Sequence, residues 1–423
     1  MADLHNQNPA AAPYDLIVIG GGPAGMTAAI YGARAKMRTL LIEKAKHGGQ
    51  AATTEEVENW PGSGKTTGPE LMQQFRKHVE HLGVDMIKED VVRVDLQGEI
   101  KVIETRKGNR LEGRAVIVAP GAHPRTLGVK GEGPLRGKGV SYCATCDADF
   151  FTELDVVVVG SGDAAVEEAI YLTKFCESVT MIVLHPEGTM DANRASQERA
   201  YANPKIKYVW QSVIEEIKGD GIVESVVLKH LGTGERSEMP TNGVFVFIGT
   251  VPNTEFLQGS GLALNPQGYI VADPETMATN LDGVFAAGDV RVKWLRQIVT
   301  AASDGAIAAC AAEKYLAEEE HLRHEVLEPK EPVLAVFWSP ASRQSLDVLA
   351  WAEQANTAAG GCFKLARIDL YKSGRLAQRY GVRQVPSVLL FIHGEVVDRL
   401  EGNFDDFTHW ITERTVCDCQ VGR

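Results

Sequence analysis

Short apolar runs followed by glycines recur along this 423-residue chain. Tyr14–Ile19 and Asp155–Val159 are rich in β-branched residues, as in strands buried on both faces. After each run the apolar positions change to helical spacing, over Ala24–Lys36 in the first case. Each second strand follows, at Arg38–Ile42 and Ser178–Leu184. This order of strands and helices occurs twice, so it predicts two α/β domains, each with a parallel sheet.

The pattern changes near Leu316. Residues 317–331 are charged, and we expect a helix end followed by a linker over 318–331. A new series of strands and helices then begins, in the order βαβαββα. Its expected elements are Val333–Trp338, Gln344–Ala355, Phe363–Asp369, Ser373–Tyr380, Ser387–Ile392, Glu395–Leu400 and Phe404–Glu413. In the middle of the chain, further strands are expected at Lys207–Trp210, Ile222–Lys229 and Gly243–Ile248.

Composition narrows the class of protein. The net charge of −13 argues against nucleic acid and anionic membranes as partners. No apolar run reaches the roughly 20 residues of a membrane span, and Met1–Pro13 lacks the features of a signal peptide. Seven cysteines are too few for a disulfide-stapled secreted scaffold. We therefore expect a cytoplasmic protein of several domains.

The first glycine-rich turn predicts a nucleotide site. Gly20 permits a tight turn, Gly22 lets the backbone approach a pyrophosphate, and Gly25 allows close packing of helix on strand. The helix N-terminus favours the phosphate charge. Glu43 ends the next strand, 18 residues after Gly25, where a carboxylate can accept a hydrogen bond from a ribose hydroxyl.

A Cys-x-x-Cys motif supplies candidate redox chemistry. Cys143 and Cys146 can form a disulfide, and a helix start there would lower a thiol pKa. Asp147 follows and can carry the proton that thiol exchange needs. The alternative is half of a zinc site, but the remaining clustered pair, Cys417 and Cys419, belongs to a different domain. We expect no metal.

The second glycine-rich turn predicts a second nucleotide site. Gly160, Gly162 and Ala165 fit the dinucleotide fingerprint, with alanine as the allowed third residue. The following strand leads to His185 and Glu187, where the ribose is read. A glutamate there can accept a bond from a free 2′-hydroxyl but repels a 2′-phosphate.

Several segments resemble the FAD-binding segments of the low-molecular-weight thioredoxin reductase family. They are Gly48-Gly49-Gln50, Glu58-Asn59-Trp60-Pro61-Gly62, Ala286–Asp289 and Arg296–Ala302, and the resemblance runs from about Tyr14 to Leu316. It implies a flavoprotein homodimer that reduces thioredoxin or a similar protein disulfide. In that family Glu43 would bind the adenosine ribose of FAD, Asp289 its ribityl chain, and Gln297 would lie beside the isoalloxazine. The other FAD-binding candidates are Gly49, Gln50, Asn59, Gly121 and Arg296.

The resemblance also assigns roles to the dithiol. Cys146 would face the flavin, Cys143 would attack the substrate disulfide, and Asp147 would exchange protons. Three departures from the family pattern stand out: Ala119-Pro120-Gly121, Ser303-Asp304-Gly305, and alanine at 148 where glycine is usual. Alanine does not reach positive φ cheaply, so the turn after the dithiol should differ slightly.

Members of the family that use NADPH carry arginines after His185, because guanidinium forks bind a 2′-phosphate. This chain has Pro186 and Glu187 instead, and Arg194 remains as a possible partner. We predict that NADH is favoured over NADPH. Rescue of NADPH binding by Arg194, and a different donor such as a ferredoxin, stay open as alternatives.

The C-terminal order resembles the thioredoxin fold, with Pro386 expected to be cis. Ser342 and Ser345 stand where thioredoxins have their cysteines, and a hydroxyl cannot cycle through a disulfide. This domain should therefore be redox-silent and serve docking, dimer support or regulation. A mobile Cys417/Cys419 tail that relays electrons is a further hypothesis.

The predicted fold is α/β. Two Rossmann-like three-layer domains, one inserted in the other, precede a thioredoxin-like fold. The predicted division is residues 1–122 and 252–317 for FAD, 123–251 for NAD(P)H, 318–331 as linker, 332–416 as thioredoxin-like domain and 417–423 as tail. The predicted function is flavin-dependent reduction of thioredoxin. The alternatives are a flavoprotein reductase with another donor or acceptor, and a redox sensor or scaffold that binds clients through its thioredoxin-like domain.

Overall fold

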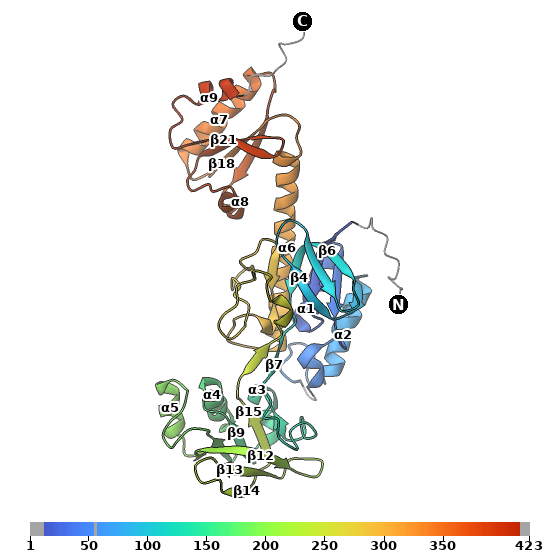
Figure 1. The fold of residues 1–423 in the computed structure, drawn as a ribbon, viewed down its shortest axis with the longest axis vertical. Coiled ribbons are helices and arrows are strands. Elements are labelled where there is room, and N and C mark those ends of the chain that lie inside the picture. The colour runs from blue at the N-terminus through green and yellow to red at the C-terminus, as the bar shows by residue number, and fades with distance from the viewer. Residues whose placement is uncertain (1–11, 55–56, 415–423) are drawn as a thin grey trace. The chain divides into compact units, whose positions relative to one another are not determined.

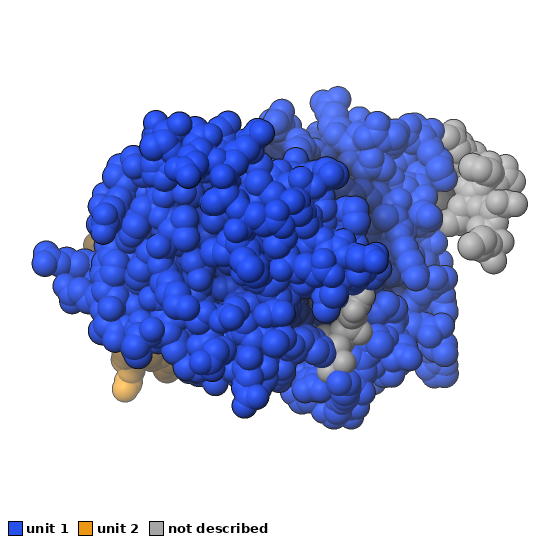
Figure 2. Space-filling view, turned by 90° about the horizontal axis from the view of Figure 1, so that it is seen from below, with its two compact units in different colours: residues 1–313 blue, residues 314–423 orange. Residues whose placement is uncertain are grey.

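The chain divides into two compact units in a computed structural model that describes residues 12–54 and 57–414 (Figure 1). The first unit ends at Glu313 and the second begins at Lys314, and Figure 2 colours them separately. Within the first unit, we call residues 12–121 and 253–313 the first lobe and residues 125–249 the second lobe. Strands β7 (Ala122–Pro124) and β16 (Thr250–Pro252) pair antiparallel where the chain passes between the lobes.

A seven-stranded mixed sheet forms the centre of the first lobe. Strand β6 is long, so its first half pairs with β5 while its second half pairs with β17. The hydrogen-bonded order is β3 (Asp85–Lys88), β2 (Thr39–Glu43), β1 (Tyr14–Ile19), β6 (Arg110–Val118), β5 (Lys101–Thr105) and β4 (Val91–Asp95), with β17 (Val284–Ala286) also on β6.

Helix α1 (Pro23–Arg34) packs on β1, β2 and β6, and α2 (Gly68–His81) packs on α1. Helix α2 begins with a capping box in which Thr67 and Glu70 bond each other's backbone N–H groups, which fixes its first turn. Helix α6 (Ile298–Leu322) starts in this lobe. Short turns of 3-10 helix lie at Gly49–Thr53, Glu255–Leu257 and Gly288–Val290.

The second lobe contains a five-stranded parallel sheet. Its order is β11 (Ile206–Val209), β10 (Ser178–Ile182), β9 (Asp155–Val159), β15 (Gly243–Val246) and β8 (Val140–Ser141). One face packs against a cluster that includes α4 (Asp163–Leu172) and α5 (Arg194–Tyr201). The other face packs against the antiparallel strands β12 (Ser212–Lys218), β13 (Ser225–His230) and β14 (Arg236–Pro240). The lobe therefore has three layers. Helix α3 (Ala144–Asp147) and a 3-10 turn (Ala148–Phe151) precede β9.

The second unit is a four-stranded mixed sheet with helices. Its strand order is β19 (Lys364–Asp369), β18 (Val333–Trp338), β20 (Ser387–Ile392) and β21 (Glu395–Glu401). Among the described strands of this sheet, only the β18–β19 pair is parallel. Its helices are α7 (Arg343–Ala358), α8 (Gly374–Arg379) and α9 (Phe407–Arg414). The Val385–Pro386 bond is cis, as predicted.

The linker expected over 318–331 is largely helical. Helix α6 runs to Leu322 and continues as a π-helical turn over Arg323–Leu327. Leu322 and Val326 are buried in the core of the second unit. The charges in this segment do not all face solvent, because Glu319 is buried and pairs with Arg375 and Arg379 at 2.5 and 3.0 Å. Part of this charged segment therefore pairs with arginines of the second unit instead of facing solvent.

Among the described residues, no helix is long and apolar enough to cross a membrane.

Candidate active site

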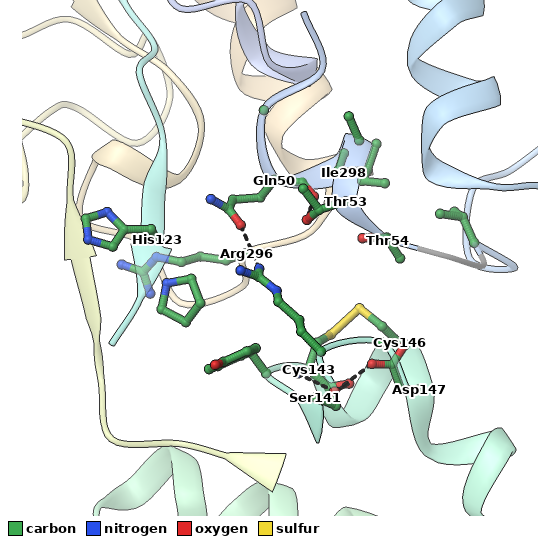
Figure 3. Close-up of a pocket in the computed structure, with 18 of the residues that line it drawn as sticks. Gln50, Thr53, Thr54, His123, Ser141, Cys143, Cys146, Asp147, Arg296 and Ile298 are labelled. Atoms are coloured by element: carbon green, nitrogen blue, oxygen red, sulfur yellow. Dashed lines mark hydrogen bonds between the residues drawn. A yellow bond between two sulfur atoms is a disulfide. The ribbon is translucent and has the colours of Figure 1, made fainter. Parts of the chain in front are cut away.

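One cavity of about 2010 Å³ brings together most of the predicted FAD and dithiol residues (Figure 3). It lies in the first unit and is lined by both lobes. The predicted residues on its wall are Gly22, Glu43, Gly49, Gln50, Asn59, Gly121, Cys143, Cys146, Asp147, Asp289, Arg296 and Gln297.

The first glycine turn is shaped for close backbone approach. Gly20 has φ +109°, and a Cβ there would lie 2.2 Å from the Ala119 carbonyl oxygen. A Cβ on Gly25 would lie 1.8 Å from the Gly20 oxygen, whereas Gly22 faces open space. Glu43 accepts hydrogen bonds from the Gly21 N–H at 2.7 Å and the Ala45 N–H at 2.8 Å. The turn and its carboxylate are therefore held rigidly at the cavity wall.

Asp289 is the polar group that most clearly lacks a partner in this cavity. Its Oδ1 is buried with no hydrogen-bond partner among the described residues. Burial raises the pKa of Asp289, an effect that Lys293 and Arg296 partly offset. A buried acceptor of this kind needs a donor from a ligand. The hydroxyls of a ribityl chain would supply one, so the residues present fit FAD.

The dithiol is oxidised and lies at the cavity wall. Cys143 and Cys146 form a disulfide with a Cα–Cα distance of 5.3 Å, and Cys143 precedes helix α3. Helix α3 has only four residues, so the helix start expected at the dithiol is a single short turn. Ala148 has φ −57°, which accommodates alanine where the family has glycine. Within residues 12–54 and 57–414, no cluster of His, Cys, Asp and Glu could hold a metal ion.

Ser141 was not predicted, yet it joins the dithiol to Asp147. Its hydroxyl donates to Asp147 Oδ2 at 2.5 Å and accepts from the Cys143 N–H at 3.1 Å. Ser141 is buried at the end of β8, and both bonds lie at the cavity wall. On the other side of the sulfurs, Gln297 Nε2 lies 3.8 Å from Cys143 Sγ, and Asn59 Nδ2 donates to Gln297 Oε1 at 3.1 Å. No local sequence pattern signals the Ser141–Asp147 contact.

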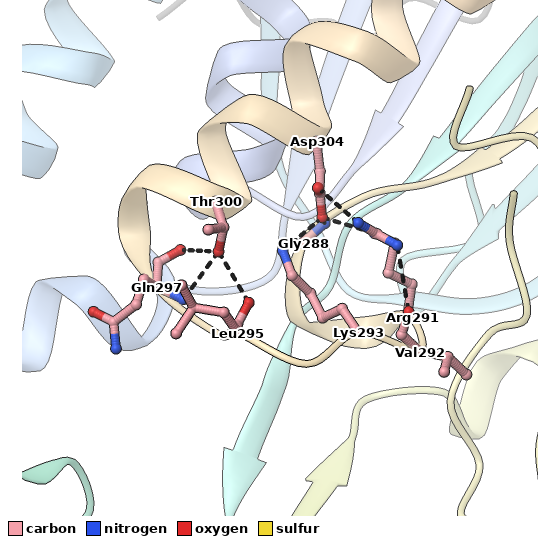
Figure 4. Close-up of polar contacts among 8 residues, drawn as sticks. All are labelled: Gly288, Arg291, Val292, Lys293, Leu295, Gln297, Thr300 and Asp304. Carbon is pink, nitrogen blue, oxygen red and sulfur yellow. Dashed lines mark hydrogen bonds and ion pairs between the residues drawn. The ribbon is translucent and has the colours of Figure 1, made fainter. Parts of the chain in front are cut away.

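A buried ion cluster supports the segment that carries Asp289 (Figure 4). Asp304 on α6 accepts from Arg291 Nε at 2.8 Å and Nη2 at 2.9 Å, from Lys293 Nζ at 2.8 Å, and from the Gly288 N–H at 3.0 Å. The cluster ties the Gly288–Val290 turn to the helix. Asp304 stands in one of the segments that depart from the family pattern, and no local motif indicates its partners.

The second glycine turn lies away from this cavity, at the ends of β9 and β10. Gly160 has φ +133°, and a Cβ there would lie 2.4 Å from the Phe247 oxygen. Gly162 faces open space at the start of α4, and Ala165 is fully buried beneath it. The geometry resembles that of the first turn, and the position of Gly162 is open to the close backbone approach that a dinucleotide fingerprint provides.

The end of this site that was predicted to contact the ribose carries acidic residues. His185 Nε2 lies 2.9 Å from Asp191 Oδ2, an oxygen that also accepts from the Ser161 hydroxyl at 2.7 Å. Glu187 is exposed, and Arg194 is 92% exposed and pairs with Glu198 at 3.1 Å. The structure thus brings His185 to a carboxylate that the sequence did not single out.

The chain is similar to known proteins over its first unit. Residues 14–305 match the family model described as pyridine nucleotide-disulphide oxidoreductase. The thioredoxin reductase of Peptoclostridium acidaminophilum is 52% identical over 310 residues, which are 72% of this chain and 97% of that protein. That of Streptomyces coelicolor is 46% identical over 305 residues, 72% of this chain and 94% of that protein. The crystal structure of the Streptococcus pyogenes thioredoxin reductase, 41% identical, covers 73% of this chain and 99% of its own with a TM-score of 0.69.

Proposed function

Since the chain belongs to the thioredoxin reductase family of flavoprotein oxidoreductases, we propose that it uses NADH in preference to NADPH to reduce thioredoxin through Cys143 and Cys146. The observation that carries this proposal is the Cys143–Cys146 disulfide on the wall of a cavity with the features of an FAD site. Bound there, FAD would supply two-electron transfer between the nicotinamide and the Cys143–Cys146 disulfide. Glu43, Asp289 and the first glycine turn would hold it.

The dithiol then carries out thiol–disulfide exchange. The Cys143 thiolate attacks one sulfur of the substrate disulfide, so a mixed disulfide forms and a substrate thiolate leaves. Asp147 takes the proton of the Cys143 thiol as its thiolate forms and passes this proton to the leaving sulfur, and in the second exchange it passes the proton of the Cys146 thiol to the second substrate sulfur. The Cys146 thiolate attacks Cys143 Sγ, which releases the second substrate sulfur and restores the Cys143–Cys146 disulfide. Ser141 holds the Asp147 carboxylate in place during both exchanges.

The preference for NADH follows from the charges at the second glycine turn. A 2′-phosphate needs cationic partners, and Arg194 is already paired with Glu198. Glu187 and Asp191 add negative charge at the same end of β10. His185 remains a candidate contact of the nucleotide.

We further propose that the second unit is thioredoxin-like and redox-silent. Its strand order, the cis Pro386 and the position of α7 after β18 support the resemblance. Ser342 caps α7 by accepting from the Ser345 N–H at 3.2 Å, and Ser345 is fully buried. The two serines thus occupy the start of the helix where the thioredoxin cysteines would be, and neither can form a disulfide.

The proposal also covers the assembly, the cellular location and the C-terminal tail. We expect a homodimer, for which the 88% exposed Trp294, with Val292 and Leu295, offers apolar surface on the first lobe. We expect a cytoplasmic location. Relay by Cys417 and Cys419 remains a hypothesis, and both residues lie outside the described residues.

The test is a variant with Cys143→Ser and Cys146→Ser. Its flavin should still bleach with NADH, whereas reduction of thioredoxin should fall to background. With dithiothreitol as the reductant, the variant should also fail to reduce insulin through its second unit. Cys310→Ser, which removes an exposed free thiol, is the matched control and should keep normal rates. Thioredoxin reduction by the double variant would refute the role of the dithiol.

A further inference from the structure

We propose that Asp191 selects the nicotinamide donor, by accepting a hydrogen bond from the adenosine 2′-hydroxyl of NADH and repelling the 2′-phosphate of NADPH. This inference rests on the proposed function and names the residue behind the donor preference. It assigns to Asp191 a role that the sequence had suggested for Glu187.

The position of Asp191 is fixed from the glycine turn. Its Oδ2 accepts from the hydroxyl of Ser161, which lies between Gly160 and Gly162, at 2.7 Å. The next residue is also tied there, because the Ala192 N–H donates to the Ser161 carbonyl oxygen at 2.9 Å. The carboxylate is therefore held beside the turn that would bind the pyrophosphate, in the crevice where Rossmann-like sheets bind dinucleotides.

The loop is held from its other end by Asn193. This residue donates to Asp163 Oδ1 through its backbone N–H at 2.6 Å and through Nδ2 at 2.7 Å, and it caps α5 by accepting from the Ser196 N–H at 3.0 Å. Asp163 is the first residue of α4. The loop at residues 191–193 is thus hydrogen-bonded at both ends to the glycine turn and the start of α4. The position of the Asp191 carboxylate is therefore fixed before a ligand binds.

Asp191 combines this fixed position with access to a ligand. Its side chain is 64% exposed, so its second oxygen can accept a bond from a ribose hydroxyl. Hydrogen bonds from Ser161 and His185 lower its pKa, which keeps the carboxylate charged at neutral pH. A charged acceptor suits a hydroxyl donor and opposes a phosphate dianion.

The arginines near this loop are already engaged. Arg194 lies 3.1 Å from Glu198, and Arg199 lies 3.8 Å from Glu167. Both pairs are on exposed surface, and each places a carboxylate beside the guanidinium that a 2′-phosphate would need. The local field therefore favours the nucleotide that carries less negative charge.

The experiment compares Asp191→Asn with the wild type. The asparagine keeps the shape and removes the charge. We expect the ratio of kcat/KM for NADH to kcat/KM for NADPH to fall at least about tenfold, which corresponds to about 1.4 kcal/mol. Glu177→Gln is the matched control, because Glu177 is an exposed carboxylate just before the opposite end of β10, and its ratio should stay at the wild-type value.

A second measurement needs no turnover. Calorimetric titration of the holoenzyme with AMP and with adenosine 2′,5′-bisphosphate reports the 2′-substituent directly. The wild type should prefer AMP, and Asp191→Asn should lose most of that preference. Faster turnover of NADPH than NADH by the wild type would overturn the proposed donor preference itself. A wild-type preference for NADH that survives Asp191→Asn, or that shifts with Glu187→Gln instead, would overturn the role of Asp191 alone.

Discussion

Removing the Asp304 carboxylate should destabilise the first lobe strongly. In the variant Asp304→Asn, two cationic side chains lose their common partner. Arg291 and Lys293 are 10% and 6% exposed, and Asp304 is 6% exposed, so water cannot replace the lost interactions. The Gly288 N–H, which precedes the flavin-site residue Asp289, also loses an anionic acceptor.

The magnitude follows from burial. Breaking a buried ion pair by removing one partner costs about 3–5 kcal/mol, because the remaining charge stays buried and uncompensated. Asparagine can still accept a hydrogen bond, so we expect about 3 kcal/mol for Asp304→Asn. The matched control is Asp90→Asn, which breaks the pair between Asp90 and Arg106 at 2.8 Å. The Asp90 side chain is 36% exposed and the Arg106 side chain is 73% exposed. An exposed pair contributes about 0–1 kcal/mol.

The effect should also depend on pH. Burial alone would raise the pKa of Asp304, but hydrogen bonds and positive charge from Arg291 and Lys293 lower it below its ordinary value. A depressed folded-state pKa means that the carboxylate stabilises the fold fully above its unfolded pKa of about 3.9 and loses this contribution as the pH falls through the folded value. The difference in stability between wild type and Asp304→Asn should therefore be constant near pH 7 and shrink below about pH 4.

Urea unfolding followed by flavin fluorescence is the suitable assay. Flavin release reports the first lobe, which avoids mixing its transition with that of the second unit. The midpoint shift multiplied by the slope m gives the change in the free energy of unfolding. If Asp304→Asn loses no more stability than Asp90→Asn at pH 7, or if the difference between wild type and Asp304→Asn grows on acidification, the structural role of this cluster is refuted.

Two further predictions concern the dithiol and the packing of helices. Ser141→Ala should slow exchange between Cys143–Cys146 and thioredoxin roughly 10- to 100-fold, because Asp147 loses its hydrogen-bond donor. Ser141→Thr keeps a hydroxyl and should retain most of the rate in stopped-flow measurements. Equal rates for both variants would contradict the positioning role of Ser141. Gly305→Ala would place a Cβ 2.0 Å from a carbonyl oxygen of α1 and should cost about 1–3 kcal/mol in the same urea assay. An unchanged urea midpoint would contradict this close packing of α6 on α1.

Local pattern was sufficient for much of the fold. The bounds of β1, β9, β18 and β20 are those that their apolar runs predict. Buried strands and glycine turns are specified by neighbouring residues, so one sequence carries their signal. The antiparallel strands β12 to β14 were harder to place, and only β13 was expected. Strand β12 has a register shift between Ile214 and Glu216 that breaks its alternation, and β14 is largely polar and exposed.

Contacts between distant residues were not predictable in this way. The charged run at 318–331 suggested a linker, but Glu319 finds its arginine partners about 60 residues later in the chain. The acidic residue at the second nucleotide site was sought directly after the strand, at Glu187, whereas the hydrogen bonds to the glycine turn involve Asp191. In each case the side chain's partner is distant in sequence, so only the folded chain brings the two close together.

The short ribbon formed by β7 and β16 has a practical consequence. The chain enters and leaves the second lobe through adjacent three-residue strands, with the Arg125 N–H donating to the Gly249 oxygen at 2.9 Å. Residues 125–249 are therefore a cassette with neighbouring ends. Exchanging this cassette between relatives would move the proposed donor-selecting loop together with the Cys143–Cys146 dithiol, while Glu43 and Asp289, on the first-lobe side of the flavin cavity, would stay in place.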